Sequence, residues 1–421
     1  MSVSETPRRR SWDSVRVVGM IRCLVLLACL GFVQGQAAQA QTVLEFWHSQ
    51  SPSEDLILRL AEQFNASQTE VRVLPRYNGT YQESAIRLVA ALGGDAAPVL
   101  FDAEVTVIPR LVEEGALADL SAYAEALPAE LLRDLEPRQW EFGVFGAGRY
   151  SLPWAMSLPV LYYNASAFAQ LGLEPPATWA EFEAVAERLT TRNTRGYIDV
   201  AAAFIFEALV TTRGGSLVSP AGEPRFDSPE AVDALSMLQR MSRARTSVPR
   251  GFAELDQALV DFARTKGMMA IAAESFFPQG ERFSVAFEVA AAPLPQDVSA
   301  ALPLMGAQLV VLAGSSEAER AGAFAFWEFL MNPEHQSAWV QDSYALPARL
   351  SVAAALQEWY AADPGRGVAL EGLPNAVYRP RVGAYVVWQG YLQEAIERAT
   401  KAGADPATVL REAQRRALES P

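Results

Sequence analysis

The chain has 421 residues, of which half are hydrophobic and a fifth are charged, and its formal net charge is −14. A chain of this length predicts two or three domains rather than a single core. The acidic balance, together with the lack of a basic patch interleaved with aromatic residues, argues against nucleic acid as a partner.

Residues 1–40 have the pattern of an export signal. Several arginines precede an apolar run at 23–33, which is too short to span a bilayer, and residues 38–40 form a small-x-small cleavage motif. We therefore expect a signal peptide over 1–40 and a mature periplasmic protein that begins at Gln41. The alternative is a lipid anchor at Cys29, because the four residues that end there loosely resemble a lipobox.

Catalytic and metal-binding patterns are sparse in the remaining sequence. Both cysteines lie inside the export signal, so we expect a mature chain without thiols, which excludes thiol catalysis and cysteine metal sites. His48 and His335 are far apart and have no clustered ligands near them, so we interpret both as structural. No phosphate-binding loop, dinucleotide fingerprint or nucleophile elbow occurs. The sequence therefore predicts no catalytic residue, no metal site and no cofactor.

The first part of the mature chain alternates between strand and helix patterns. Strands are predicted at 42–49, 71–75 and 97–102, and helices at 51–66, 81–94 and 105–115. The helix at 51–66 carries Leu56, Leu60 and Phe64 at four-residue spacing, which predicts one buried face. This alternation indicates an α/β fold with helices packed on a parallel or mixed sheet.

The middle and the end of the chain continue the pattern. Helices are predicted at 178–189, 228–241 and 316–331, strands at 267–273 and 307–314, and mostly helix over the last sixty residues. Thr178 and Glu181 predict a capping box, Ser228 with Pro229 predicts a helix start, and the strand at 267–273 is expected to be buried. With no internal repeat and no long linker, the pattern fits two α/β lobes that share the chain more than once.

The stretch SLPWAMSLPVLYYN, residues 151–164, combines strand character with many polar groups. It contains no charged residue, yet it carries a tryptophan, two serines and two adjacent tyrosines. A strand that only filled a core would not need so many polar side chains. We therefore ask whether this stretch lines a place where a polar ligand binds.

Seven stretches occur in the order found in a known family. They are EFWHS, YNGTYQE, APVLFDAE, LPWAMSLPVLYYN, GLEPPATWAEF, GMMAIAA and NPEHQSAWVQDSYALPAR. From about Thr42 to Pro421 the chain resembles the extracellular solute-binding proteins of sugar-type ABC importers. Within that family it is most similar to the subgroup that binds sn-glycerol 3-phosphate.

The resemblance implies a fold, a division into lobes and a function. The implied fold is α/β, the two-lobed periplasmic-binding-protein fold of type II, with the ligand cleft between the lobes. The N-terminal lobe is expected to comprise 41–152 plus 306–343, and the C-terminal lobe 153–305 plus 344–421. The implied function is to capture a small hydroxylated ligand (a sugar, a polyol or a glycerol-3-phosphate-type compound) by lobe closure and to deliver it to ABC permease subunits. We expect a monomer without enzymatic activity and without a nucleic acid partner.

The resemblance also implies ligand contacts, one residue at a time. The tyrosine of the Gly-x-Tyr turn corresponds to Tyr81, which can stack on a polyol or hydrogen-bond to it. The acid that follows a strand in the family corresponds to Glu104, just after the strand predicted at 97–102, and its carboxylate can accept from hydroxyl groups. Ser157 lies on the stretch that crosses between the lobes. Gly306 lets a backbone N–H approach the ligand closely.

At other positions the match to the family weakens. Where the family has a serine in the second lobe, this chain has Ala273, and Ser275 is a nearby substitute. Where the family has a tyrosine, this chain has Ala345, and Tyr344 lies one residue earlier. At the position of the arginine that binds phosphate in the glycerol-phosphate subgroup, this chain has Gln389.

Arg379 and Arg381 precede Gln389 by ten and eight residues, and Arg381 is the candidate to replace the missing arginine. We therefore expect the polyol end of the site to be kept and the phosphate end to be altered.

Aromatic rings are the other usual element of a sugar site. The candidates are Trp47, Trp154, Phe204, Phe276 and Trp388, for each of which a place in the core is the alternative. Of these, Trp154 and Phe204 lie where the family places such rings.

Two other functions remain open at this stage. A secreted carbohydrate-active enzyme would need a pair of carboxylates in one cleft, and the sequence does not single out such a pair. A surface sensor could reuse the same fold, since fold alone does not settle function.

Overall fold

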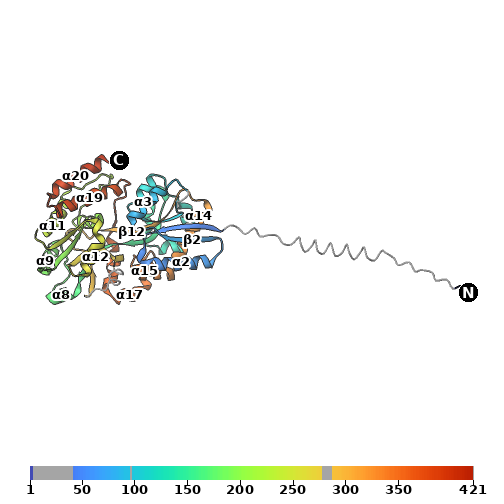
Figure 1. Ribbon diagram of the computed structural model, residues 1–421, viewed down its shortest axis with the longest axis horizontal. Helices are drawn as coiled ribbons and strands as arrows, with labels where there is room; N and C mark the ends of the chain where they lie inside the picture. Colours follow the sequence, from blue (N-terminus) through green and yellow to red (C-terminus); the bar gives the residue numbers. More distant parts are fainter. Residues whose placement is uncertain (3–40, 95–96, 277–286, 421) are drawn as a thin grey trace. The chain divides into compact units, whose positions relative to one another are not determined.

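The structure, a computed structural model, describes residues 1–2, 41–94, 97–276 and 287–420. The predicted signal peptide, its cleavage motif and the alternative anchor site at Cys29 lie outside the described residues. The fold described below begins at Thr42, drawn in blue in Figure 1.

A first mixed sheet is built around one long strand, β12. Its strands are β1 (Thr42–His48), β2 (Val71–Tyr77), β3 (Leu100–Glu104), β6 (Leu152–Ser157), β12 (Leu302–Val311) and β13 (Ala376–Tyr378). The order is β13-β12-β3-β1-β2, and β6 pairs with β12 as well. β1 runs parallel to β2 and β3, whereas β12 runs antiparallel to β3 and β6. The predicted strands of this region are confirmed, and β12 begins at Leu302 rather than at residue 307.

Several helices pack against this first sheet and form the first lobe with it. They are α2 (Glu54–Ser67), α3 (Tyr81–Ala91), α4 (Ile108–Glu113), α5 (Ser121–Glu125), α6 (Ala129–Asp134), α7 (Pro137–Phe142), α14 (Glu317–Leu330) and α15 (Pro333–Ser343). Leu60 and Phe64 of α2 and Phe326 of α14 share one core with Leu44 and Phe46 of β1. The four-residue spacing read from the sequence therefore marks the buried face of α2, as predicted.

A second sheet has the order β11-β7-β10-β8-β9. Its strands are β7 (Pro159–Asn164), β8 (Arg195–Val200), β9 (Ser247–Arg250), β10 (Gly267–Ala273) and β11 (Val289–Ala292). β8 runs parallel to β9 and β10, while β7 runs antiparallel to β10 and β11. The predicted strand at 267–273 is confirmed, but it is not buried throughout. Met269 and Ile271 on one face are buried, whereas Met268, Ala270 and Ala272 on the other face are partly exposed.

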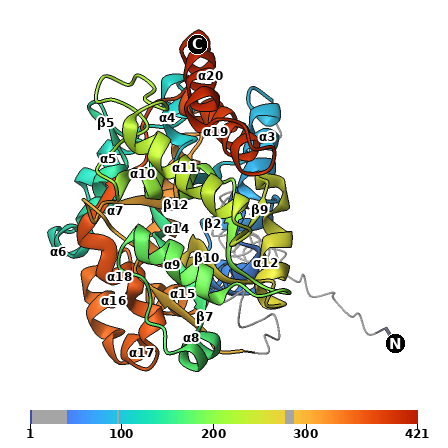
Figure 2. The same ribbon diagram turned by 90° about the vertical axis from the view of Figure 1, so that its left-hand side faces the viewer.

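The helices of the second lobe surround this sheet. They are α8 (Ala165–Leu171), α9 (Trp179–Leu189), α10 (Ala203–Thr211), α11 (Pro229–Arg243), α12 (Leu255–Ala263), α19 (Tyr385–Thr400) and α20 (Pro406–Glu419). α19 and α20 lie beside α11, as Figure 2 shows.

Two predicted helix starts in this lobe can be compared with the structure. Ser228 caps α11 by accepting from the N–H of Ala231, and Pro229 follows it, as predicted. Thr178 caps α9, but the carboxylate of Glu181 accepts from the N–H of Ala177 rather than from Thr178, so the predicted capping box is only half formed.

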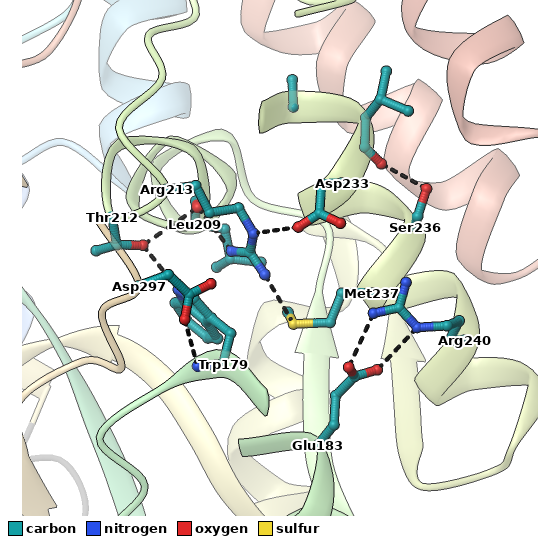
Figure 3. A network of polar contacts seen from close by, with 12 residues as sticks. Trp179, Glu183, Leu209, Thr212, Arg213, Asp233, Ser236, Met237, Arg240 and Asp297 are labelled. Atoms are coloured by element: carbon teal, nitrogen blue, oxygen red, sulfur yellow. Dashed lines mark hydrogen bonds and ion pairs between the residues drawn. The ribbon is translucent and has the colours of Figure 1, made fainter. Parts of the chain in front are cut away.

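A buried arginine joins three helices of the second lobe (Figure 3). Arg213 donates to the carboxylate of Asp233 at 2.9 Å and to the carbonyl of Leu209 at 2.8 Å, and its guanidinium lies 5.0 Å from the centre of the Trp179 ring. Because Arg213 is buried, these contacts fix α9 and α11 against the end of α10. The neighbouring pair of Arg240 and Glu183 is solvent-exposed, and pairs of that kind contribute little to stability.

The chain passes from the first sheet to the second at a single residue. β6 ends at Ser157 in the first sheet, Leu158 is fully buried, and β7 starts at Pro159 in the second sheet. Later, β13 returns to the first sheet before α19 packs in the second lobe. Strand pairing thus places β6 with the first lobe, whereas the sequence assigned residues from 153 onward to the second. The lobe boundaries as a whole stay a prediction.

The remaining elements connect or border the two lobes. They are the hairpin of β4 (Val144–Phe145) and β5 (Gly148–Arg149), helices α16 (Leu350–Ala355), α17 (Gln357–Ala361) and α18 (Val368–Gly372), and the short 3₁₀ turns η1 (Ser51–Ser53), η2 (Phe252–Glu254), η3 (Glu274–Phe276), η4 (Pro364–Gly367) and η5 (Leu373–Asn375). The described part of the chain has no helix that combines the length and the apolar character needed to cross a bilayer.

Candidate ligand-binding cleft

A cavity of about 630 Å³ lies between elements of the two lobes. The first lobe contributes residues from α3, β3 and β6, and the second lobe contributes residues from α10, α12, β10 and α19. Its polar or charged lining residues include Gln50, Tyr81, Glu104, Thr106, Ser157, Ser275, Arg379 and Gln389. We refer to this cavity as the cleft.

The cleft lies at the carboxyl ends of several strands. Gln50 follows β1, Glu104 ends β3, Phe204 comes shortly after β8, and Ser275 follows β10. In open α/β sheets ligands bind outside the carboxyl ends of the strands, because the loops there can carry side chains toward one point. The topology therefore favours this cavity as the ligand site over a second cavity of about 700 Å³, which is lined largely by the loop at 214–222.

Tyr81 enters the cleft from the first turn of α3 and is held by Gln50. The Nε2 of Gln50 donates to the hydroxyl of Tyr81 at 2.6 Å and to Oδ2 of Asp102 at 2.8 Å. Burial raises the pKa of Asp102 to about 7, against the hydrogen bonds from Gln50 and Ser49, which lower it. Because Gln50 supplies a proton to its oxygen, the Tyr81 hydroxyl can direct its own proton toward a ligand.

Glu104 is surrounded by donors from both lobes. Its Oε2 accepts from the backbone N–H of Thr106 at 3.0 Å and from the hydroxyl of Thr106, which in turn accepts from Gln389 Nε2 at 2.9 Å. Its Oε1 accepts from Arg379 at 2.7 Å. Burial raises the pKa of Glu104, even though Arg379 favours the ionised form. Of the four lone pairs of this carboxylate, about one remains to accept from a ligand.

Arg379 lies at the centre of this network. Its Nε and Nη2 donate to both oxygens of Glu207 at 2.8 Å each, its Nη1 donates to Glu104, and Nη2 also donates to Oε1 of Gln389 at 2.7 Å. Tyr385 donates its hydroxyl proton to Glu207. Burial alone would lower the pKa of Arg379, and the carboxylates of Glu207 and Glu104 outweigh burial and raise that pKa above its ordinary value. Its guanidinium is thus occupied by protein groups.

Two of the predicted contacts on β6 and β12 lie side by side. Ser157 and Gly306 both line the cleft, and the backbone N–H of Ser275 approaches the hydroxyl of Ser157 at 3.4 Å. Gly306 has φ of +100°, and a Cβ at this position would lie 2.1 Å from the carbonyl oxygen of Ala155. A glycine is therefore required here by the close passage of β6 as well as by the backbone angle.

The structure brings most of the sequence-predicted site residues to the cleft. Those that line it are Tyr81, Glu104, Ser157, Phe204, Ser275, Gly306 and Gln389. Their roles as ligand contacts stay predictions.

Three predicted residues lie elsewhere among the described residues. Trp154 is buried in the core of the first lobe, where its ring stacks on Trp339 at 4.1 Å, because β6 is buried on both faces. Tyr344 caps α15 with φ of +55° and packs against Trp359. Arg381 stacks over Phe145 and lines the second cavity instead of the cleft.

Sequence reasoning did not assign Gln50, Thr106 or Arg379 to the site. Gln50 and Thr106 lie two residues beyond the ends of β1 and β3, so the rule of strand ends could have found them. Arg381 rather than Arg379 is the candidate that the sequence offers near Gln389, although it is Arg379 that is hydrogen-bonded to Gln389.

The two histidines do not contribute to the cleft. His48 is fully buried in the first lobe, and burial lowers its pKa to about 4. His335 lies against Phe329 with its Nδ1 next to the carbonyl of that residue. Across the described ranges no group of three or more histidine, cysteine, aspartate or glutamate side chains is arranged to hold a metal ion.

Two α/β lobes with a polar cleft at their strand ends define a solute-binding protein with the type II fold. The chain belongs to the family described as bacterial extracellular solute-binding proteins, whose sequence profile matches residues 59–368. The family resemblance read from the sequence is thereby confirmed. Members of this family bind small molecules and work with ABC permeases, so this chain is a binding protein and not an enzyme.

Individual relatives are similar over nearly the whole fold. The sn-glycerol-3-phosphate-binding periplasmic protein UgpB of Pectobacterium atrosepticum is 25% identical over 379 residues, which cover 83% of each chain. The crystal structure of UgpB from Mycobacterium tuberculosis in complex with glycerophosphocholine has a TM-score of 0.81 at 23% identity and covers 90% of this chain and 98% of that one. A solute-binding protein from Thermotoga lettingae bound with α-D-tagatose has a TM-score of 0.80 at 22% identity, with 90% and 99% covered.

Replacing Arg379 by methionine is expected to destabilise the protein strongly. The change leaves Glu104 and Glu207 buried without a counter-ion, a loss that costs about 3–5 kcal/mol of unfolding free energy near pH 7.5. Without the cation, the burial that raises the pKa of Glu104 is no longer opposed by Arg379, so the folded-state pKa of this carboxyl lies above the unfolded value of about 4.3. The cost is therefore largest at neutral pH and shrinks as the pH falls toward that value.

Urea unfolding at pH 7.5 and pH 5 measures both effects. Arg110→Met is the matched control, because Arg110 forms only an exposed pair with Glu114 and its loss should cost about 0.5 kcal/mol or less. Equal losses for the two variants, or a loss for Arg379→Met that does not depend on pH, would contradict the assigned role of Arg379.

Proposed function

We propose that the cleft binds a small hydroxylated compound, either a neutral sugar or polyol or a glycerol-phosphate ester, in preference to free glycerol 3-phosphate. The observation that carries this proposal is the state of Arg379. Arg379 is the only cationic side chain among the described residues that line the cleft, and it is already paired with two carboxylates.

Electrostatics at the cleft disfavour a doubly charged phosphate. About four of the five N–H groups of Arg379 donate to groups of the protein. Arg379 therefore does not offer the two unpaired N–H groups that a bidentate bond to phosphate requires. The position that corresponds to the phosphate-binding arginine of the glycerol-phosphate subgroup holds Gln389, which is neutral. A phosphate placed beside Glu104 would also be repelled by that carboxylate.

Hydroxyl groups match the lining better. Tyr81 offers a hydroxyl proton, Glu104 offers a remaining lone pair, and Ser157 can both donate and accept. The alternation of donors and acceptors suits a polyol, in which each hydroxyl donates once and accepts once or twice. The bound compounds named for the related structures, glycerophosphocholine and α-D-tagatose, carry several hydroxyl groups and agree with this proposal.

Isothermal calorimetry with a panel of ligands tests the proposal. Sugars, linear polyols and glycerophosphodiesters should include a compound that binds at least as tightly as glycerol 3-phosphate. Gln389→Arg should improve glycerol 3-phosphate binding by about ten- to a hundredfold, because it adds a charge-assisted bond that the native cleft lacks. Glu104→Gln should weaken every ligand, whereas Glu62→Gln on the exposed side of α2 should weaken none.

Tight binding of glycerol 3-phosphate by the unmodified protein, with no gain in Gln389→Arg, would refute the preference for ligands of lower charge. Loss of that binding in Arg381→Ala would show that Arg381 holds the phosphate.

We also infer that ligand binding closes the two lobes of a monomer, which then delivers the ligand to the permease. The cleft has walls from both lobes, and a ligand that contacts both stabilises the closed arrangement. We take the lobes as the sequence predicts them, except that the first passage between them is moved from residue 153 to Leu158, as the strand pairing favours. A surface sensor built on the same fold is the alternative, and loss of ligand uptake in cells that lack the protein distinguishes the importer from it.

Small-angle scattering with and without a bound compound from the panel tests closure and the monomer together. The radius of gyration should fall on binding while the mass stays that of one chain. An unchanged radius at saturation would exclude hinge closure, and a doubled mass would exclude the monomer. The fluorescence of Trp154 is not a suitable measure of lobe closure, since this side chain is buried in the core of the first lobe.

The cellular form of the protein is the last part of the proposal. Relatives are periplasmic or extracellular binding proteins, and the sequence motif at 38–40 supports a free periplasmic form that begins at Gln41. N-terminal sequencing of material from the cell envelope should give Gln41 as the first residue. A lipid-modified Cys29 at the terminus would show the anchored form instead.

A further inference from the structure

An apolar chamber of about 200 Å³ lies in the second lobe, next to the cleft. Its walls come from β7, β8 and β10 on one side and from α12 on the other. Its lining residues are Tyr162, Ile198, Val200, Phe204, Leu255, Ala258, Leu259, Phe262, Ala270, Ile271, Ala272, Ala273, Val289 and Met305.

The described residues that line the chamber present no polar side-chain group that needs a partner from a ligand. Among its described lining residues, Tyr162 carries the side-chain hydroxyl, and this hydroxyl already donates to the backbone carbonyls of Ala273 and Glu274. An apolar cavity of this kind holds water poorly and accepts apolar molecules readily. The chamber therefore suits a hydrocarbon group and does not suit a hydroxyl group.

The chamber and the cleft share part of their lining. Four residues line both cavities, namely Phe204, Leu255, Ala273 and Met305. Phe204, Leu255 and Ala273 are only partly buried, as expected for side chains that border open space. A ligand in the cleft thus meets the chamber through apolar side chains and the small side chain of Ala273.

The small side chains of β10 explain why the chamber exists. Ala270 and Ala272 lie on the face of β10 that is turned toward α12, and both are partly exposed, whereas a strand packed tightly against a helix would bury them. On the helix, Ala258 is small as well. Larger residues at these three positions would fill the space, so the sequence itself leaves it open.

We propose that the ligand carries a short apolar substituent beside its hydroxylated part, and that the chamber binds this substituent. This inference rests on the proposed function, because the hydroxylated part occupies the cleft next to Tyr81, Glu104 and Ser157. The substituent is a short alkyl chain or a group of similar size and polarity. The site then selects amphiphilic ligands, with polar recognition in the cleft and apolar burial in the chamber.

Two series of ligands test this proposal by calorimetry, 1-O-alkylglycerols and n-alkyl β-D-glucosides with chains from methyl to hexyl. Within a series that binds, affinity should rise about fourfold for each added methylene group, as expected for burial of a CH₂ group, until the chamber is full. Ala258→Leu fills the chamber from α12, so it should abolish the rise while leaving the affinity of the methyl compound unchanged. Ala66→Leu, at an exposed position of α2, should keep the full rise.

Ala272→Leu, on the opposite wall, repeats the test if Ala258→Leu does not fold, which circular dichroism reports. An affinity that does not depend on chain length would overturn the proposal. So would a rise that persists in both filled variants. If no member of either series binds, the proposed function fails together with this inference. If the methyl compounds bind, and bind more weakly to Glu104→Gln, but affinity does not rise with chain length, this inference alone is refuted.

Discussion

The ion pairs of Arg379 are the interaction on which the polar half of the cleft depends. Glu104 ends a strand of the first sheet, and Glu207 lies on α10 in the second lobe, so a single guanidinium joins the two lobes at the site. The cation offsets the desolvation of these carboxylates, which costs several kcal/mol for each buried charge. Thr106 and Gln389 complete the same network by hydrogen bonds, which leave about one lone pair of Glu104 open.

This use of the arginine also limits what the cleft can recognise. An arginine that binds phosphate must present unpaired N–H groups, whereas Arg379 uses nearly all of its donors within the protein. In the proposed site, recognition then depends on groups with spare hydrogen-bonding capacity, which are Tyr81, Ser157 and one oxygen of Glu104. Such groups recognise hydroxyl groups by whether each hydrogen bond is donated or accepted. Specificity among hydroxylated compounds therefore has to come from the shape of the cavity as well.

The sequence predicted much of the fold and part of the site, for identifiable reasons. The four-residue spacing in α2 and the cap at Ser228 are local signals, and both are confirmed. The family resemblance, and not a local signal, assigns Tyr81 and Glu104 to the site, and both line the cleft. Arg379 was missed because ten residues of sequence between it and Gln389 do not show that the chain turns back at the start of α19. Trp154 was misplaced because β6 is buried on both faces, so its side chain has no cavity to enter.

Small residues determine the shape of the cleft as much as polar residues determine its chemistry. Where the family resemblance leads one to expect a serine and a tyrosine, this chain has Ala273 and Ala345, and both line the cleft. Ser275 lies close enough to replace the serine, but Tyr344 packs against Trp359 and cannot replace the tyrosine. At these two positions the cleft is lined by small apolar side chains. Because Ala273 also borders the apolar chamber, the loss of a polar side chain there opens the cleft toward a region that only an apolar group can fill.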